Sequence, residues 1–114
     1  MDLDAYQLVL LRRHASAPDL PDDRLQELQR AHVAFYGSMR EAGHVVTNGP
    51  VHNSPDETLR GIAIYRAESE SDALALARSD PSVRAGRLTV DVMTWWAPRG
   101  TLSRPGRAIE IDDP

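Results

Sequence analysis

Hydrophobic positions change period along this chain, alternating every second residue in some stretches and recurring every three or four residues in others. Alternation or a short unbroken apolar run predicts strands at residues 6–12, 44–47, 59–65 and 88–96. Helical spacing predicts helices at residues 21–42 and 70–79. This order of elements is typical of the α+β ferredoxin-like fold, βαββαβ, with a four-stranded antiparallel sheet. We expect one such domain at 1–97 and an extended tail at 98–114, where prolines and glycines replace most large apolar groups.

Short signals set the expected ends of these elements. Gly43 closes the first helix in a left-handed conformation, and Asn48-Gly49-Pro50 stops the second strand. Ser69 is the expected cap of the second helix. Asp80-Pro81 is expected to terminate that helix, because a residue before proline is pushed out of the helical region.

The first predicted helix carries an apolar stripe that contains one histidine. The stripe recurs at spacings of 3, 4, 3, 4 and 3 residues and consists of Leu25, Leu28, His32, Phe35, Met39 and Ala42. This position turns His32 toward the sheet. A buried imidazole without a hydrogen-bond partner costs about 1 to 3 kcal/mol. His32 is therefore either a satisfied core histidine or a functional group that an acidic partner holds in one tautomer.

Both helices are expected on one face of the sheet, which leaves the other face bare. The last strand alternates and sends Asp91, Met93 and Trp95 to one side and its valines to the other. A bare apolar face of this size is unusual in a monomer. The simplest way to bury it is a second copy, so we expect a two-fold homodimer through the sheet face, a dimeric α/β barrel.

Composition removes several classes of chemistry. All 13 basic residues are arginine, and with 17 acidic residues the net charge is −4. The chain contains no lysine and no cysteine, which excludes a lysine Schiff base, a cysteine nucleophile and thiolate metal sites. The acidic balance argues against nucleic acid as a partner. No apolar run approaches the roughly 18 residues of a membrane helix, so we expect a cytoplasmic protein without a membrane partner.

Asp80 is the candidate partner of His32. It follows the second helix, and Pro81 limits where its carboxylate can point. The alternative is a simple helix-terminating Asp-Pro turn. The other histidines, His14, His44 and His52, lack close metal-ligand spacing, so no metal site is expected.

Four further sites are candidates for a role, and three of them keep two interpretations. Tyr36, beside the stripe, either adds a hydroxyl to a pocket or is exposed or at an interface. Asp91 is either an acid in the dimer cavity or a rim or interface residue bound to an arginine. Trp95-Trp96 sends one indole to each face, one to the core and the other to line the dimer cavity. Arg12-Arg13 either attracts an anionic substrate or solvates a loop.

In combination, several of these motifs resemble the YciI-like (YCII-related) family of small dimeric α+β barrel proteins. The matching residues are the helix histidine in Arg30-Ala31-His32, Thr47-Asn48-Gly49-Pro50 near the family's Gly-Pro, Asp80-Pro81, and Gly86 before the last strand. The resemblance implies that His32 and Asp80 form an acid–base dyad and that Gly49 and Pro50 belong to the substrate site. Ser82 stands where the family usually has an aromatic residue, and the tail is longer than the family core.

A histidine oriented by a carboxylate can take a proton at neutral pH and return it elsewhere. The resemblance adds an aromatic-degradation dehydrochlorinase as a relative, and the same architecture hosts an isomerase and polyketide-tailoring oxygenases. We therefore expect a cofactor-free small-molecule enzyme of the lyase or isomerase type, acting on an aromatic or polyketide-like substrate through His32 and Asp80. Tyr36, Asp91 and Trp95 are the further candidates for substrate contact. The alternative is a non-catalytic metabolite-binding or accessory dimeric module.

Overall fold

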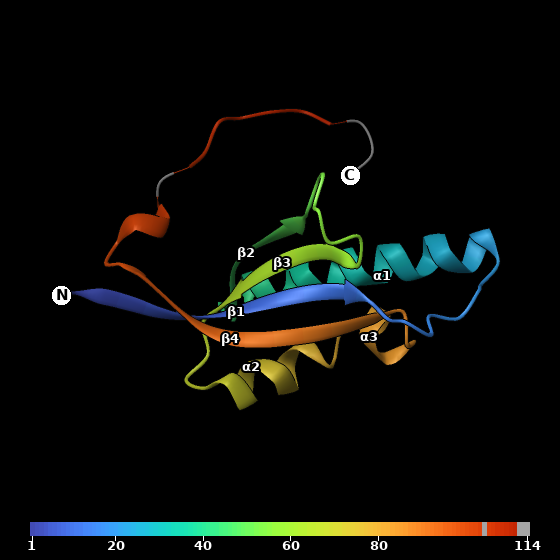
Figure 1. Ribbon diagram of the computed structural model, residues 1–114, viewed down its shortest axis with the longest axis horizontal. Coiled ribbons are helices and arrows are strands. Elements are labelled where there is room, and N and C mark those ends of the chain that lie inside the picture. The colour runs from blue at the N-terminus through green and yellow to red at the C-terminus, as the bar shows by residue number, and fades with distance from the viewer. Residues whose placement is uncertain (104, 112–114) are drawn as a thin grey trace.

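The computed structural model describes residues 1–103 and 105–111 and shows a four-stranded antiparallel sheet with helices on one face (Figure 1). The strands lie in the order β2-β3-β1-β4. Their bounds are Leu3–Arg13 for β1, Val45–Pro50 for β2, Leu59–Tyr65 for β3 and Leu88–Pro98 for β4. The helices are α1 (Asp22–Glu41), α2 (Glu70–Ala77) and the short α3 (Pro81–Arg84), and a 3-10 turn, η1, spans Thr101–Ser103. The predicted ferredoxin-like order is confirmed, with α3 and η1 as additions.

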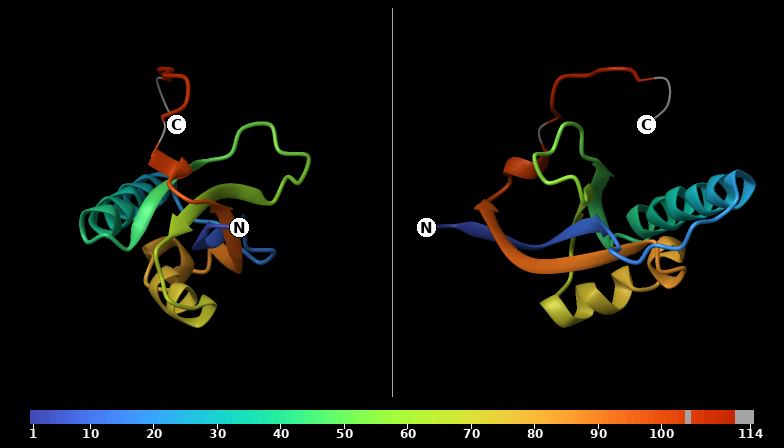
Figure 2. Two further views of the ribbon diagram at one scale, coloured as in Figure 1. Left: turned by 90° about the vertical axis from the view of Figure 1, so that its left-hand side faces the viewer. Right: turned by 45° about the vertical axis from the view of Figure 1, so that its right-hand side comes forward.

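The hydrophobic core lies between the sheet and the helices. Figure 2 shows α1 and α2 on the same side of the sheet, with the opposite side uncovered. Val9 and Ala63 are paired across β1 and β3, and both are fully buried under the helices. Val90 and Val92 of β4 point to the same side, as the alternation predicts, and pack against this core.

The predicted stripe of α1 is at least partly buried from Leu25 to Met39, and Tyr36 beside it is buried as well. Tyr36 and Met39 are the buried residues of α1, whereas Phe35 is only partly buried. Tyr36 is 0% exposed, so the expectation of an exposed or pocket-lining tyrosine is wrong. Tyr36 and Tyr65 can both be buried because their hydroxyls form a hydrogen bond with each other at 2.9 Å.

Gly43 ends α1 as predicted. Its φ of 82° lies in the left-handed region, and its N–H donates to the Arg40 carbonyl at 3.1 Å. The His44 N–H donates to the Met39 carbonyl at 3.0 Å. These two bonds form a Schellman motif, which satisfies carbonyls at the end of the helix and turns the chain into β2.

The prediction that Asn48-Gly49-Pro50 stops the second strand is wrong. These three residues are the second half of β2, where they pair with Ala63, Ile62 and Gly61 of β3. Proline is accepted here because β2 is an edge strand, which needs only one row of hydrogen bonds. The strand consequently carries Asn48 and Pro50 past the C-terminal half of α1.

The segment after α2 contains a helix that the sequence pattern did not predict. Ser69 caps α2 as expected, with its hydroxyl oxygen accepting from the Asp72 N–H at 3.1 Å. Helix α2 ends at Ala77, and Asp80-Pro81 then starts α3 rather than only terminating α2. Proline suits this position because the first turn of a helix needs no N–H from it.

The last strand extends two residues beyond its predicted end, to Pro98. Trp96 is 67% exposed and Trp95 is 37% exposed, so the prediction that one of them lies in the core is wrong for a single chain. Past η1, the described residues 105–111 form neither helix nor strand, and the division into a domain and a tail stays a prediction. The predicted tail also includes residues 104 and 112–114, which lie outside the described residues.

Candidate active site

His32 and Asp80 lie in contact, as the sequence suggested. The His32 Nδ1 and the Asp80 Oδ2 are 2.7 Å apart, a short distance typical of a charge-assisted hydrogen bond. Asp80 is fully buried, whereas the His32 side chain is 17% exposed. The carboxylate of the pair is therefore shielded from solvent, whereas the imidazole is partly accessible.

The two side chains come from α1 and from the start of α3, which pack against each other. Asp80 is the N-cap of α3, and its Oδ1 accepts from the Ser82 N–H at 2.9 Å. One carboxylate oxygen is thus held by the helix start and the other by the imidazole. The carboxylate can point in only one way while both bonds are kept, so α3 fixes the orientation of the pair.

The hydrogen bond to Asp80 assigns the roles of the two imidazole nitrogens. An ionised carboxylate only accepts hydrogen bonds, so Nδ1 of His32 carries the proton of this bond. In the neutral ring, Nε2 is then the nitrogen with a free lone pair. His32 lines a cavity, which makes Nε2 available to a bound molecule.

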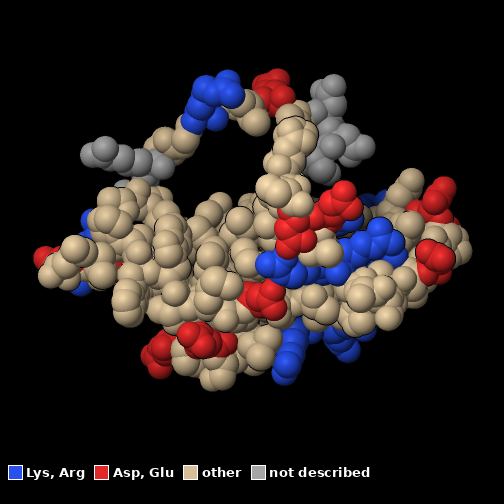
Figure 3. Space-filling model, in the orientation of Figure 1, with Lys and Arg blue, Asp and Glu red and all other residues tan. Residues whose placement is uncertain are grey.

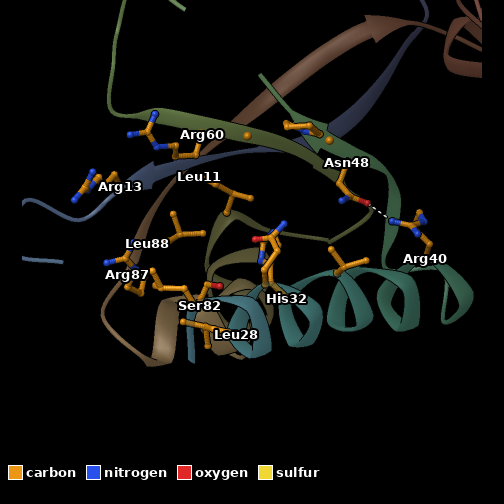
Figure 4. A pocket seen from close by; sticks show the side chains of 16 residues that line it. Leu11, Arg13, Leu28, His32, Arg40, Asn48, Arg60, Ser82, Arg87 and Leu88 are labelled. Carbon is orange, nitrogen blue, oxygen red and sulfur yellow. Dashed lines mark hydrogen bonds between the residues drawn. The ribbon is translucent and has the colours of Figure 1, made fainter. Parts of the chain in front are cut away.

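That cavity has a volume of about 690 Å³ and lies between α1 and the sheet (Figure 4). This volume falls in the usual range for small-molecule sites. Its apolar walls come from α1, β1 and the start of β4, and they consist of Leu11, Leu25, Leu28, Val33 and Leu88. Leu25 and Leu28 of the predicted helix stripe line this space.

Two buried tyrosines lie behind the pair, on the side away from the cavity opening. The Tyr36 ring meets the His32 ring edge to face, with centroids 5.2 Å apart. Burial raises the pKa of Tyr36 and raises the pKa of Tyr65 to about 12, so both hydroxyls stay neutral at physiological pH. No buried side-chain polar atom of the described residues lacks a hydrogen-bond partner. The side chains behind His32 are thus closely packed, and their polar groups are hydrogen-bonded.

The candidate substrate contacts divide between two faces of the molecule. Gly49 and Pro50 line the cavity with His32. Tyr36 does not, because it has no exposed surface. Asp91 and Trp95 lie on the opposite, bare face of the sheet, where Asp91 accepts a hydrogen bond from Arg12 Nε at 2.7 Å. The rim alternative for Asp91, binding to an arginine, matches this contact.

The cavity is also lined by residues that were not among the candidate site residues of the sequence. Asn48 lies on the cavity side of β2 and accepts a hydrogen bond from Arg40 of α1. Ser82 lines the cavity through the missed α3, and Arg60 and Arg87 contribute cationic groups. Arg13 had a signal in the pattern, because alternation in β1 places it on the same face as Leu11.

Within the described part of the chain, no group of three or more histidine or acidic side chains is arranged to hold a metal ion. His14 accepts a hydrogen bond from the Ser16 N–H at 2.9 Å through its Nδ1.

Among the residues that the structure describes, no helix is long and apolar enough to span a bilayer.

Comparison with known proteins supports the fold. A model of the YCII-related domain family matches residues 8–96. The 5-chloro-2-hydroxyhydroquinone dehydrochlorinase of Burkholderia phenoliruptrix AC1100, solved in complex with 2,5-dihydroxybenzoquinone, is similar, with a TM-score of 0.50, 17% identity, and coverage of 78% of this chain and 90% of that one. A hydroxynitrile lyase from Passiflora edulis has a TM-score of 0.44 and 13% identity, covering 84% of this chain and 95% of that one. No curated protein sequence matches the chain.

Proposed function

Because the chain belongs to the family of YCII-related domains, we propose that it is a small-molecule enzyme that transfers protons through His32 and Asp80. The observation that carries the proposal is the 2.7 Å bond between the His32 Nδ1 and a fully buried carboxylate, at the wall of a cavity. This arrangement is that of a general base with its orienting group. The chemistry requires no cofactor.

The proposed reaction begins with Nε2 of His32 taking a proton from a C–H or O–H bond of the substrate. The imidazole becomes an imidazolium, and the adjacent Asp80 carboxylate stabilises that positive charge. The electron pair left on the substrate then has two routes. It either expels a leaving group, as in a lyase, or accepts the same proton at another atom, as in an isomerase.

For the substrate, we propose a hydroxylated aromatic or polyketide-like molecule. The apolar walls suit a flat ring, and the volume of about 690 Å³ admits a molecule of one or two rings. The dehydrochlorinase of similar fold was solved with 2,5-dihydroxybenzoquinone, a flat hydroxylated six-membered ring.

We also propose that two copies pair through the bare sheet face. Figure 3 looks onto this face and shows a stretch without charged side chains over the left half of the molecule, while charged groups lie at its centre and right-hand end and along its left and lower edges. Tyr6 and Trp95 contact each other on it at a ring-centroid distance of 6.3 Å, and Met93 is 39% exposed. A second copy would cover these apolar groups, as an isologous interface requires.

Deuterium exchange tests the enzymatic proposal even while the substrate is unidentified. A panel of 1,3-dicarbonyl and polyhydroxylated aromatic compounds is incubated in D2O with the protein, and deuterium incorporation is followed by NMR. We expect at least one compound to exchange at a rate that His32→Asn lowers by roughly a hundredfold, because general base catalysis contributes about that much or more. Asparagine can keep the bond to Asp80 but lacks Nε2.

The matched control is His44→Asn, which removes a histidine that does not line the cavity. This variant should exchange at the wild-type rate. Equal exchange by wild type and His32→Asn for every compound would contradict the proposal. Saturable binding of a compound without exchange would instead identify a metabolite-binding module.

A further inference from the structure

The charged side chains that line the cavity beside His32 are all arginines. Four of its lining residues are arginines, Arg13, Arg40, Arg60 and Arg87, and no aspartate or glutamate lines it. This contrasts with the whole chain, in which 17 acidic residues outnumber 13 basic ones. The cavity is therefore electropositive in a protein of net charge −4, which favours an anionic ligand.

Three of these arginines lie together at one end of the cavity. Figure 4 shows Arg13, Arg60 and Arg87 on one side of the view, with Leu11 and Leu88 between them and His32. They come from the end of β1, the start of β3 and the turn before β4. We call Arg13, Arg60 and Arg87 the arginine end of the cavity.

A β-bulge explains how Arg60 reaches this end. Leu11 of β1 pairs with Gly61, but the next residue, Arg12, pairs with Leu59, so Arg60 is an extra residue in β3. Such a bulge breaks the strict alternation and redirects a side chain. Arg60 consequently lines the cavity beside Gly61. A Cβ at Gly61 would lie 3.0 Å from the Gly49 carbonyl oxygen, so residue 61 itself has no room for a side chain.

The arginine end keeps unused hydrogen-bond donors. Among the described residues, the guanidinium groups of Arg13 and Arg60 make no ion pair or hydrogen bond, and that of Arg87 donates to the Pro18 carbonyl at 2.5 Å. The neighbouring Arg12, on the bare face, is by contrast paired with two carboxylates, those of Asp56 and Asp91. Two adjacent arginines in one strand thus have opposite environments, and only the one that faces the cavity lacks a counter-charge.

We infer that the ligand of this cavity carries a carboxylate or phosphoryl group, which the arginine end binds, while its apolar body lies on Leu11 and Leu88 and reaches His32. Guanidinium groups match such oxyanions through paired N–H donors. The inference rests on the proposed function only for the location of the site, since anion binding needs no proton transfer.

Binding of matched probes tests this inference. Benzoate, phenyl phosphate and neutral benzamide are titrated into the full chain, with the arginine Nε–Hε signals followed by NMR. We expect at least one anion to shift the signals of the arginine end saturably, with a Kd at least about tenfold lower than that of benzamide. Arg13→Gln and Arg60→Gln should each raise that Kd by roughly tenfold, the effect of one charge-assisted hydrogen bond. The tighter of the two anions identifies carboxylate or phosphoryl recognition.

The control is Arg78→Gln at the end of α2, an exposed arginine that does not line the cavity. Its Kd should equal that of the wild type. Benzamide binding as tightly as both anions, a Kd unchanged in Arg13→Gln and Arg60→Gln, or no saturable shift would each overturn the inference. His32→Asn separates the two proposals, because it should lose exchange while keeping anion binding. A protein that binds the anion but catalyses no exchange refutes the proposed enzyme alone.

Discussion

Replacing Asp80 with alanine should lower the free energy of unfolding by about 3 kcal/mol. The substitution removes the N-cap bond of α3, which is worth about 1 kcal/mol, and the charge-assisted bond to His32, worth about 1.5 to 3 kcal/mol. It also leaves the His32 Nδ1 and the Ser82 N–H without the partner they have in the native chain. Urea unfolding followed by circular dichroism measures the difference.

Two matched variants show whether the buried contacts cause this loss. Asp80→Asn keeps an oxygen for the Ser82 N–H and an amide group opposite His32, so its loss should be smaller, about 1 kcal/mol. Asp23→Ala removes an exposed carboxylate from the first turn of α1 and should cost less than about 0.5 kcal/mol. A loss below about 1 kcal/mol for Asp80→Ala would mean that the pair does not hold α3 against α1.

Replacing Met93 with arginine should convert the proposed dimer into monomers. Met93 is 39% exposed in one chain, so arginine is tolerated there by the isolated fold. In the dimer, the same position would bury an unpaired charge against the second sheet, at a cost of at least about 3 kcal/mol. That cost raises the dimer Kd more than a hundredfold.

Sedimentation equilibrium measures the assembly directly. The wild type should have twice the chain mass of 12.6 kDa. Over the same concentration range, Met93→Arg should have the mass of a single chain. Gln26→Arg, on the exposed side of α1, adds the same charge away from the sheet and should stay dimeric. A monomeric wild type would contradict the proposed pairing, and a dimeric Met93→Arg would place the interface elsewhere.

The periodic parts of the fold were predictable because burial on one face dictates them. The β4 alternation placed Val92 and Met93 on opposite faces, and Gly43 gave the end of α1 through its left-handed conformation. The failures occurred where tertiary context overrides a local signal. Pro50 indicates a turn in isolation, but the open edge of β2 admits it into a strand.

The candidate site was likewise predictable only in part. His32 interrupts an apolar stripe and Asp80 precedes a proline, so both stood out in the sequence, and the structure brings them together. The role of Asp80 as a helix cap was missed, because four-residue helices such as α3 have no periodicity to detect. Arg60 was also missed, since its place in the cavity depends on a bulge in the pairing of β1 with β3. Tyr36 was misplaced because its buried hydroxyl is satisfied only by Tyr65, 29 positions away.

Asp80 holds His32 so that Nε2 is a free base at the cavity. The nitrogen-15 chemical shifts of the His32 ring test it directly, because they distinguish a protonated from an unprotonated ring nitrogen at a pH where the ring is neutral. In the wild type we predict the proton on Nδ1 and a bare Nε2, and in Asp80→Asn, whose amide can donate to Nδ1, a shift of the proton to Nε2. A wild-type ring with its proton on Nε2, or with the proton averaged over both nitrogens, would contradict the account.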